Sequence, residues 1–341
     1  MEVVRRQEGW SQPWRSWLVG VIISLVALLI AVRGVRPERL LQALSDADYR
    51  WLALAAALVL LGLLARARSW KTLMGDAVPL SQAFEALCQG YLLNNLLPLR
   101  LGELGRAYIV SRKGRIGAIQ ALSTIVVERL IDASISLLGL SVALLTLFAP
   151  SWARELAWAA GLLLIGTIAV LMAGVFLRRS WLALLARLPE RRLGWVHVAA
   201  QDFLTALKSI GRPRRLLNAA FWSLLAWTAV WVEFWVLMRM FGLNGSLVAP
   251  LFVSGVIAFG VALPASPGAL GVYELAAVAS MRVLGFNAED ALSVAIIAHL
   301  LQFLLTASIG AWGLSRQGLS LTDVAAKAHA FFRRRPDSVV P

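Results

Sequence analysis

The amino-acid sequence predicts an all-α, polytopic transmembrane protein with about six spans and two broken helical segments in an inverted repeat. Of its 341 residues, 59% are hydrophobic and 15% are charged, against roughly 45 to 50% and about 25% in soluble domains. Long apolar runs alternate with short basic segments, and Pro and Gly interrupt two of the runs. In so apolar a chain, the net charge of +14 indicates basic residues in cytoplasmic loops and not a surface that binds nucleic acid. We therefore do not expect nucleic acid as a partner.

Six uninterrupted apolar stretches are long enough to be spans, because crossing ~30 Å of hydrocarbon takes about 20 helical residues. They cover residues 14–33, 50–66, 117–148, 156–177, 216–241 and 290–313. The first has no cleavage site after it, so we interpret it as a retained span. Two further stretches, 83–97 and 249–285, contain Pro and Gly and are predicted to be re-entrant helical segments.

The distribution of Lys and Arg predicts that both termini are cytoplasmic. This orientation places 25 of these residues inside and 6 outside, in agreement with the positive-inside rule. The predicted order is a cytoplasmic segment at 1–16, one transmembrane domain at 17–315 and a cytoplasmic tail at 316–341. The domain contains repeat halves at about 83–148 and 249–313, and an Arg-rich cytoplasmic linker at 178–215 with an amphipathic stretch predicted to lie on the membrane.

The two broken segments resemble each other at a constant spacing. At an offset of 166 positions, Pro98, Gly102 and Gly105 correspond to Pro264, Gly268 and Gly271, and residues 121–123 then correspond to 291–293 at an offset of 170. The first segment enters from the cytoplasm and the second from outside in the predicted topology, so the halves are inverted. Such repeats are typical of secondary transporters. The alternative is chance recurrence in a Leu- and Ala-rich chain.

Ionisable residues inside the third span predict a polar site. Glu128, Arg129 and Asp132 would together cost roughly 8 to 10 kcal/mol facing lipid. Glu128 and Asp132 share a helix face at a four-residue spacing, and Arg129 reaches Asp132 at i,i+3. They either line a polar cavity or form a buried ion pair that only fixes packing. The second half contains a weaker polar stripe formed by His299, Gln302 and Thr306. One more acid, Glu233, is also predicted to be buried.

The first break has the chemistry of a phosphate site. A helix that begins after Pro98 would present free N–H groups, and Arg100 and Arg106 flank it with fork-shaped donors. Alternatively, these arginines snorkel to the interface. Further candidate binding residues of this break are Asn94, Asn95 and Glu103, of which the asparagines could instead repair backbone hydrogen bonds. The second break has no basic residue and offers Ser266, Pro267, Gly268, Gly271 and Glu274.

No residues have the spacing of a catalytic or cofactor site. Cys88 is the single cysteine, and the three histidines are scattered, so we expect no disulfide, metal or cofactor. No phosphate-binding loop of the GxxxxGK[ST] type and no nucleophile with an adjacent base occurs in the sequence. We therefore assign no catalytic residue.

Three motifs in order, NNLLPLRLGELGR at 94–106, ERLID at 128–132 and PASPGALGVYE at 264–274, resemble the transmembrane region of lysylphosphatidylglycerol synthases, a flippase-like family. The resemblance covers roughly residues 15–320. It implies movement of an anionic or aminoacylated phospholipid, or a lipid-linked sugar, between leaflets of a prokaryotic inner membrane. It also implies functional roles for matching residues in the motifs, namely Asn95, Pro98, Arg100, Gly102, Glu103, Arg106, Glu128, Arg129, Asp132, Pro264, Pro267, Gly268, Gly271 and Glu274.

The sequence departs from the family pattern in two places. Ala269 stands where the resemblance implies a second glycine, and 28 residues follow the last span, too few for the aminoacyl-transferase domain of the two-domain synthases. We therefore expect a lipid translocase without synthase activity, leaving room for a separate soluble or membrane enzyme as partner. Two alternatives stay open: an intramembrane lipid-modifying transferase, and a structural or regulatory membrane protein.

Overall fold

The computed structural model describes residues 13–97, 101–112, 116–148, 213–262, 265–321 and 323–324, with isolated positions between 155 and 166. Side chains are described from residue 18 onward. The predicted span at 156–177 and the linker up to residue 212 therefore lie outside the described residues as continuous elements. The same holds for Pro98, Arg100 and Pro264.

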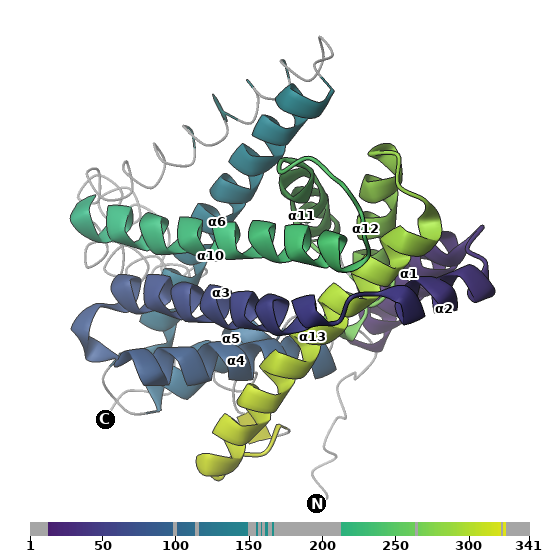
Figure 1. The fold of residues 1–341 in the computed structure, drawn as a ribbon. Helices are drawn as coiled ribbons and strands as arrows, with labels where there is room; N and C mark the ends of the chain where they lie inside the picture. The colour runs from purple at the N-terminus through teal and green to yellow at the C-terminus, as the bar shows by residue number, and fades with distance from the viewer. Residues whose placement is uncertain are drawn as a thin grey trace, which may run out of the picture.

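Every regular element in these described ranges is helical (Figure 1). The α-helices are α1 (Pro13–Val32), α2 (Pro37–Asp46), α3 (Arg50–Met74), α4 (Leu80–Leu96), α5 (Gly102–Ser111), α6 (Ala118–Leu147), α10 (Pro213–Met240), α11 (Ala249–Gly260), α12 (Val272–Val283) and α13 (Ala288–Arg316). Two single turns, η1 (Gly75–Ala77) and η3 (Pro267–Ala269), interrupt them.

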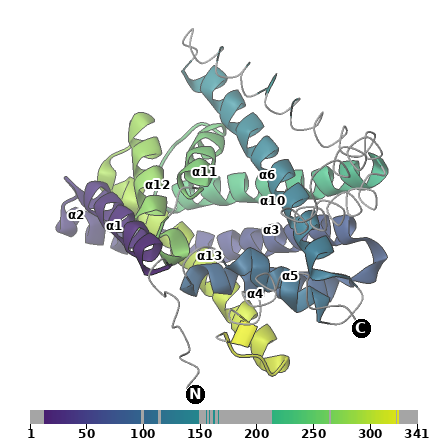
Figure 2. The same cartoon turned by 180° about the vertical axis from the view of Figure 1, so that it is seen from behind.

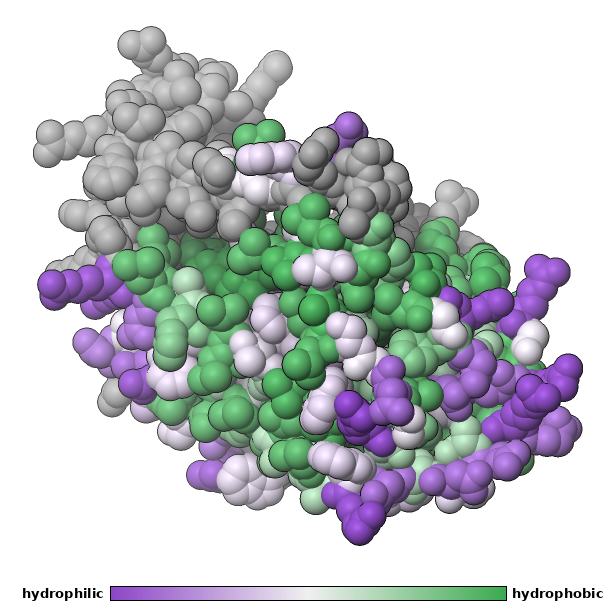
Figure 3. All heavy atoms as spheres, turned by 45° about the horizontal axis from the view of Figure 1, so that its top comes forward, coloured by the Kyte–Doolittle hydropathy of each residue, from purple (hydrophilic) through white to green (hydrophobic). Residues whose placement is uncertain are grey.

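Four described helices are long and apolar enough to cross a membrane, and the bent pair of α1 and α2 raises the number to five. The four single helices are Arg50–Ala77, Ala118–Leu147, Arg214–Met240 and Ala288–Arg316. Figure 3 shows hydrophobic side chains across the middle of one face, with hydrophilic residues toward its edges. A polytopic helical membrane protein is therefore confirmed.

Two details of the predicted elements are wrong. The second span does not end at residue 66, because α3 continues for two more turns to Met74; the charge of Arg66 does not end the buried stretch, since this side chain has an ion-pair partner. The segment after the first span, where no helix is predicted, is also helical. Pro37 begins α2, which has no buried residue and bends 81° away from α1, as expected of an amphipathic helix at the interface.

Helices α3 and α10 form the central pair of the fold. Ser69 near the end of α3 bonds to the Ala219 carbonyl oxygen and to Ser223 near the start of α10, at 2.9 and 3.0 Å, so the two helices run antiparallel. Gly62 of α3 lies opposite Ala226 and Ala229 of α10, where a Cβ would make ordinary van der Waals contact at 3.7 Å. Figures 1 and 2 show this pair crossing the middle of the molecule, with α4 and α5 toward one end and α11 and α12 toward the other.

The order helix, break, short helix, long helix occurs twice, as α4, α5, α6 and as α11, α12, α13. The halves interlock, because α4 packs along α13 and α11 packs along α6. Each half also has its own apolar core of buried side chains. Since α3 and α10 precede the two halves and run antiparallel, the arrangement is the one that an inverted repeat requires.

The offset between the two halves changes from 166 to 170 positions at an earlier point in the chain than the glycines indicate. Helices α5 and α12 begin 170 positions apart, as do α6 and α13. Gly102 and Gly105 are therefore inside α5, whereas Gly268 and Gly271 precede α12. The extra residues of the second break form the turn η3, in which Gly268 adopts a φ of 68°.

Candidate functional site

The polar residues of α6 form one buried stripe, as their four-residue spacing predicts. Thr124 and Glu128 are 0% exposed, and Asp132 and Ser136 are 5% and 3% exposed. Glu128 lies ten residues after Ala118, the first residue of α6, which is roughly 15 Å along the helix axis. The stripe therefore lies at hydrocarbon depth when α6 crosses a membrane, and its charges need partners.

Asp132 is paired with arginines from two helices. Arg66 of α3 donates from Nη1 to Oδ2 of Asp132, and Nη2 of Arg129 lies 3.7 Å from the same oxygen at i,i+3. The sequence predicts the Arg129 contact but not the one with Arg66. The available signal is the spacing of Arg66 and Trp70, which places both on one face of a helix that continues past residue 66.

Glu128 is paired with Arg106 of α5 and with Arg129. Nη2 of Arg106 lies 3.0 Å from Oε2 of Glu128, with the two side chains 3% and 0% exposed, and Nη2 of Arg129 donates to Oε1 at 3.0 Å. The Arg106 guanidinium lies 4.6 Å from the ring centroid of Trp70, whose Nε1 donates to Thr124. Arg106 therefore neither snorkels to the interface nor lies open to a phosphate.

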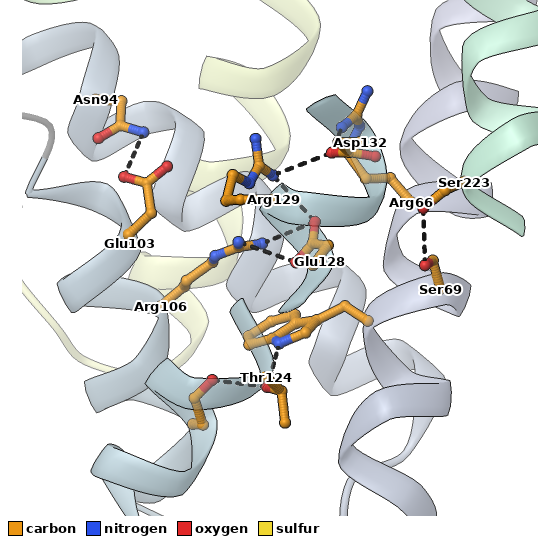
Figure 4. A network of polar contacts seen from close by, with 12 residues as sticks. Arg66, Ser69, Asn94, Glu103, Arg106, Thr124, Glu128, Arg129, Asp132 and Ser223 are labelled. Carbon is orange, nitrogen blue, oxygen red and sulfur yellow. Dashed lines mark hydrogen bonds and ion pairs between the residues drawn. The ribbon is translucent and has the colours of Figure 1, made fainter. Parts of the chain in front are cut away.

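These five residues, Arg66, Arg106, Glu128, Arg129 and Asp132, form the arginine–carboxylate network (Figure 4). They come from three helices, α3, α5 and α6, that meet at their buried faces. Three permanent positive charges face two carboxylates, which leaves an excess of one positive charge among them. The carboxylate of Glu103 on α5 also interacts electrostatically with Arg129, so it offsets this excess.

Glycines let α5 approach α4 at the first break. A Cβ on Gly102 would collide with the carbonyl oxygen of Gly90, so a larger residue would separate the two helices. Oδ1 of Asn94 accepts the Gly102 N–H at 2.7 Å, and Nδ2 of Asn94 donates to Glu103 at 3.2 Å. Asn94 thus repairs the backbone at the break. Asn95 instead bonds to Thr306 of α13 at 3.3 Å.

A small pocket with a cavity volume of about 10 Å³ opens onto the network, which is room for roughly one water molecule. The side chain of Arg129 is 40% exposed, in contrast to Glu128 and Asp132, and its Nε has no hydrogen-bond partner among the described residues. Of the three predicted residues of α6, Arg129 is therefore the one whose side chain is partly exposed, and the two acids are buried. The pocket is lined by Leu87, Gly90, Tyr91, Asn94, Gly102, Glu103, Arg106 and Arg129.

The second break is closed by a carboxylate and not by an asparagine. Oε2 of Glu274 accepts the Gly271 N–H at 2.6 Å, and Oε1 lies 2.6 Å from Nδ1 of His299 on α13. The backbone N–H of Ser266 donates to Ser24 of α1 at 2.8 Å. Pro267 and Gly268 form the turn η3 between them. The second break therefore joins α1, α12 and α13.

Ala269 carries a left-handed conformation. Its φ is 53°, in the region that favours glycine. The departure from the family pattern at this position thus places an alanine where the backbone favours a glycine.

Two predicted residues belong neither to the arginine–carboxylate network nor to the second break. Glu233 on α10 is 5% exposed but makes no hydrogen bond or ion pair within the described ranges. Gln302, one turn beyond His299 on α13, is half-buried, and its side chain likewise has no described partner. No group of three or more His, Cys, Asp or Glu side chains among the residues searched could hold a metal ion.

Comparison with known proteins gives a family match and distant relatives. The family model of the lysylphosphatidylglycerol synthase TM region matches residues 17–310. The UPF0104 membrane protein PH1989 of Pyrococcus horikoshii is 23% identical over 86% of this chain and 94% of its own length. The UPF0104 membrane protein MJ1078 of Methanocaldococcus jannaschii is 23% identical over 64% of this chain and 91% of its own length.

A third relative has a name that states an activity. The glycosyltransferase AglD of Haloferax volcanii is 22% identical over 91% of this chain, but the match covers 56% of AglD. The family model covers well over half of this chain. The chain, a multi-pass helical membrane protein, therefore belongs to the family of the lysylphosphatidylglycerol synthase transmembrane region.

Proposed function

We propose that the protein moves a lipid with an anionic headgroup between membrane leaflets, and that Arg129 binds the headgroup. The observation that carries this proposal is the partly open Arg129 side chain, which lines a pocket at the edge of the buried arginine–carboxylate network. An isolated charge at a helix centre costs about 2.5 to 3.5 kcal/mol even on the lenient insertion scale. An open arginine at this depth is therefore expected to serve a ligand or water.

The polar groups around Arg129 suit a phosphate-bearing headgroup. The Arg129 side chain is 40% exposed, and charge-assisted bonds from arginine to phosphate are short and strong. Glu103 lines the same pocket and is able to accept from an ammonium or hydroxyl group. An aminoacylated phosphatidylglycerol or a lipid-linked sugar phosphate has both kinds of group, and such a membrane lipid is the partner we propose.

The interlocked halves support movement rather than storage of the lipid. Each short helix, α5 or α12, begins at a break and packs on its own long helix. Rocking of one half against the other would open the network to either leaflet, as in transporters with inverted repeats. The predicted orientation, with both termini in the cytoplasm, makes the cytoplasmic leaflet the one nearer to α5.

The experiment uses the purified protein in vesicles that contain fluorescent phosphatidylglycerol. Dithionite bleaches the outer leaflet, so the rate of further bleaching reports movement between leaflets. We expect Arg129→Gln to slow this movement about tenfold, equivalent to ~1.4 kcal/mol. The matched control is Arg50→Gln, because Arg50 is 91% exposed and pairs with Asp48; its rate should equal that of the wild type.

Mass spectrometry of the same lipids tests the alternative function. A relative named as a glycosyltransferase favours a second candidate, a lipid-modifying transferase, which would change the mass of an acceptor lipid when a sugar donor is added. Movement without a mass change supports the translocase. Equal rates for Arg129→Gln and wild type would remove Arg129 from the mechanism, and a mass change without movement would favour the transferase.

A further inference from the structure

The second half of the fold contains a buried acid–base pair that differs in chemistry from the network of the first half. Oε1 of Glu274 lies 2.6 Å from Nδ1 of His299, and the side chains are 8% and 11% exposed. The ring of Tyr273 stacks on the imidazole at a centroid distance of 4.2 Å and an interplanar angle of 27°. The Gly271 N–H holds the other carboxylate oxygen, so the pair is fixed from both sides.

His299 occupies the place in the second half that Arg129 occupies in the first, and Glu274 lies one position beyond Tyr273, the equivalent of Glu103. His299 stands on α13 170 positions after Arg129 on α6, the same spacing that relates the starts of these helices. Glu274 and Glu103 both lie in the first turn of the short helix. Arginine does not release its proton in proteins, whereas histidine titrates close to neutral pH. The first half therefore holds a permanent charge where the second holds a titratable one.

The surroundings contain few other groups that exchange protons. Helix α11 and residues 18–32 of α1 contain no ionisable side chain, and α10 contributes Glu233, which interacts electrostatically with Tyr273. The ionisable groups at the ends of α13 are engaged elsewhere: Glu289 accepts the Arg36 N–H and Arg316 pairs with Glu85 of α4. On α3, Arg66 is paired with Asp132. Asp290 of α13 bonds to Asn287, and Arg282 at the end of α12 is exposed. Among the described residues, Tyr273 and Glu233 are thus the ionisable side chains left near the pair.

We propose that the Glu274–His299 pair is a proton-binding site, and that its protonation is coupled to lipid movement. One proton adds at Nε2 of His299, while Nδ1–H continues to donate to the Glu274 carboxylate, so uptake changes the pair from a net charge of −1 to zero. Release of this proton restores the negative charge. Binding and release of the proton therefore change the electrostatic free energy of exposing the second half to lipid. The permanent charge of Arg129 cannot change it in this way. The coupling, but not the proton binding, rests on the proposed function.

Proton binding is tested without lipid movement. In a His197→Gln, His329→Gln background, His299 is the remaining histidine of the sequence, and nitrogen-15 NMR of labelled histidine in detergent follows it alone. We expect imidazole signals that change reversibly with pH, and a different pH dependence of these signals in Glu274→Gln, since Oε1 of the carboxylate lies 2.6 Å from Nδ1. The control is Ser280→Ala, a buried position on the same helix whose hydroxyl bonds to a backbone oxygen. Spectra that do not change with pH, or that are identical in Glu274→Gln, would overturn the site.

Coupling is tested in vesicles with a pH gradient of one unit and the membrane potential clamped. With one proton per lipid, the wild type should hold up to about a tenfold difference in labelled lipid between leaflets. His299→Gln and Glu274→Gln should still move lipid, but to equal distribution. A wild type that moves lipid to equal distribution despite the gradient would refute coupling and leave the proposed function standing. A wild type that moves no lipid would refute the proposed function and, with it, the coupling, while the NMR titration alone would decide the proton site.

Discussion

Replacing Glu128 by glutamine removes the most deeply buried carboxylate of the network. Glu128 is 0% exposed and faces Arg106, which is 3% exposed. Breaking a buried pair costs roughly 3 to 5 kcal/mol, because the remaining charge is left uncompensated. Arg129 keeps Asp132 at 3.7 Å and is partly open, and Arg106 keeps the Trp70 ring at 4.6 Å. We therefore expect Glu128→Gln to lower the free energy of unfolding by about 3 kcal/mol, the lower end of that range.

A double-mutant cycle isolates the contact between Arg106 and Glu128. The single variants Arg106→Gln and Glu128→Gln and the double variant are unfolded by denaturant in detergent micelles, and the free energies are compared. We expect a coupling free energy of about 1 to 3 kcal/mol. The same cycle on Asp48 and Arg50, whose side chains are 37% and 91% exposed, is the control and should show no measurable coupling. Coupling between Arg106 and Glu128 as small as in this control would contradict the buried ion pair.

Two further predictions concern the second break and the topology. Gly271→Ala should lower the melting temperature strongly, because Gly271 has a φ of 84° and an added Cβ would collide with the Ser24 carbonyl oxygen. The control Gly117→Ala, with no atom within 4 Å of the added Cβ, should leave the melting temperature unchanged. Equal melting temperatures of the two variants would argue against the close contact with α1. In a Cys88→Ser background, an impermeant maleimide added to intact cells should label Asn244→Cys and not Arg112→Cys, and the reverse pattern would refute the predicted orientation.

The helical fold and the polar stripe of α6 could be predicted from the sequence because both are local properties. Apolar length reflects the thickness of the hydrocarbon layer, and the four-residue spacing of Glu128 and Asp132 places them on one helix face whatever packs against it. The two breaks were predicted for the same reason, since Pro and Gly mark a break wherever they occur. The end of α3 was not predicted, because the charge of Arg66 is tolerated at depth by a partner 66 positions away.

The partners of these charges were decided by the tertiary structure alone. The sequence predicts Arg106 at a phosphate site or at the interface, yet the packing of α5 on α4 and α6 buries it against Glu128. Asn94 and Glu274 close equivalent breaks with different side chains, and only the crossing of α12 and α13 brings Glu274 to His299. The sequence by itself determined which residues need a partner, because desolvation penalises any buried charge. Which partner each one meets depends on helix angles and close approaches, which are set by glycines and side-chain packing between segments distant in the chain.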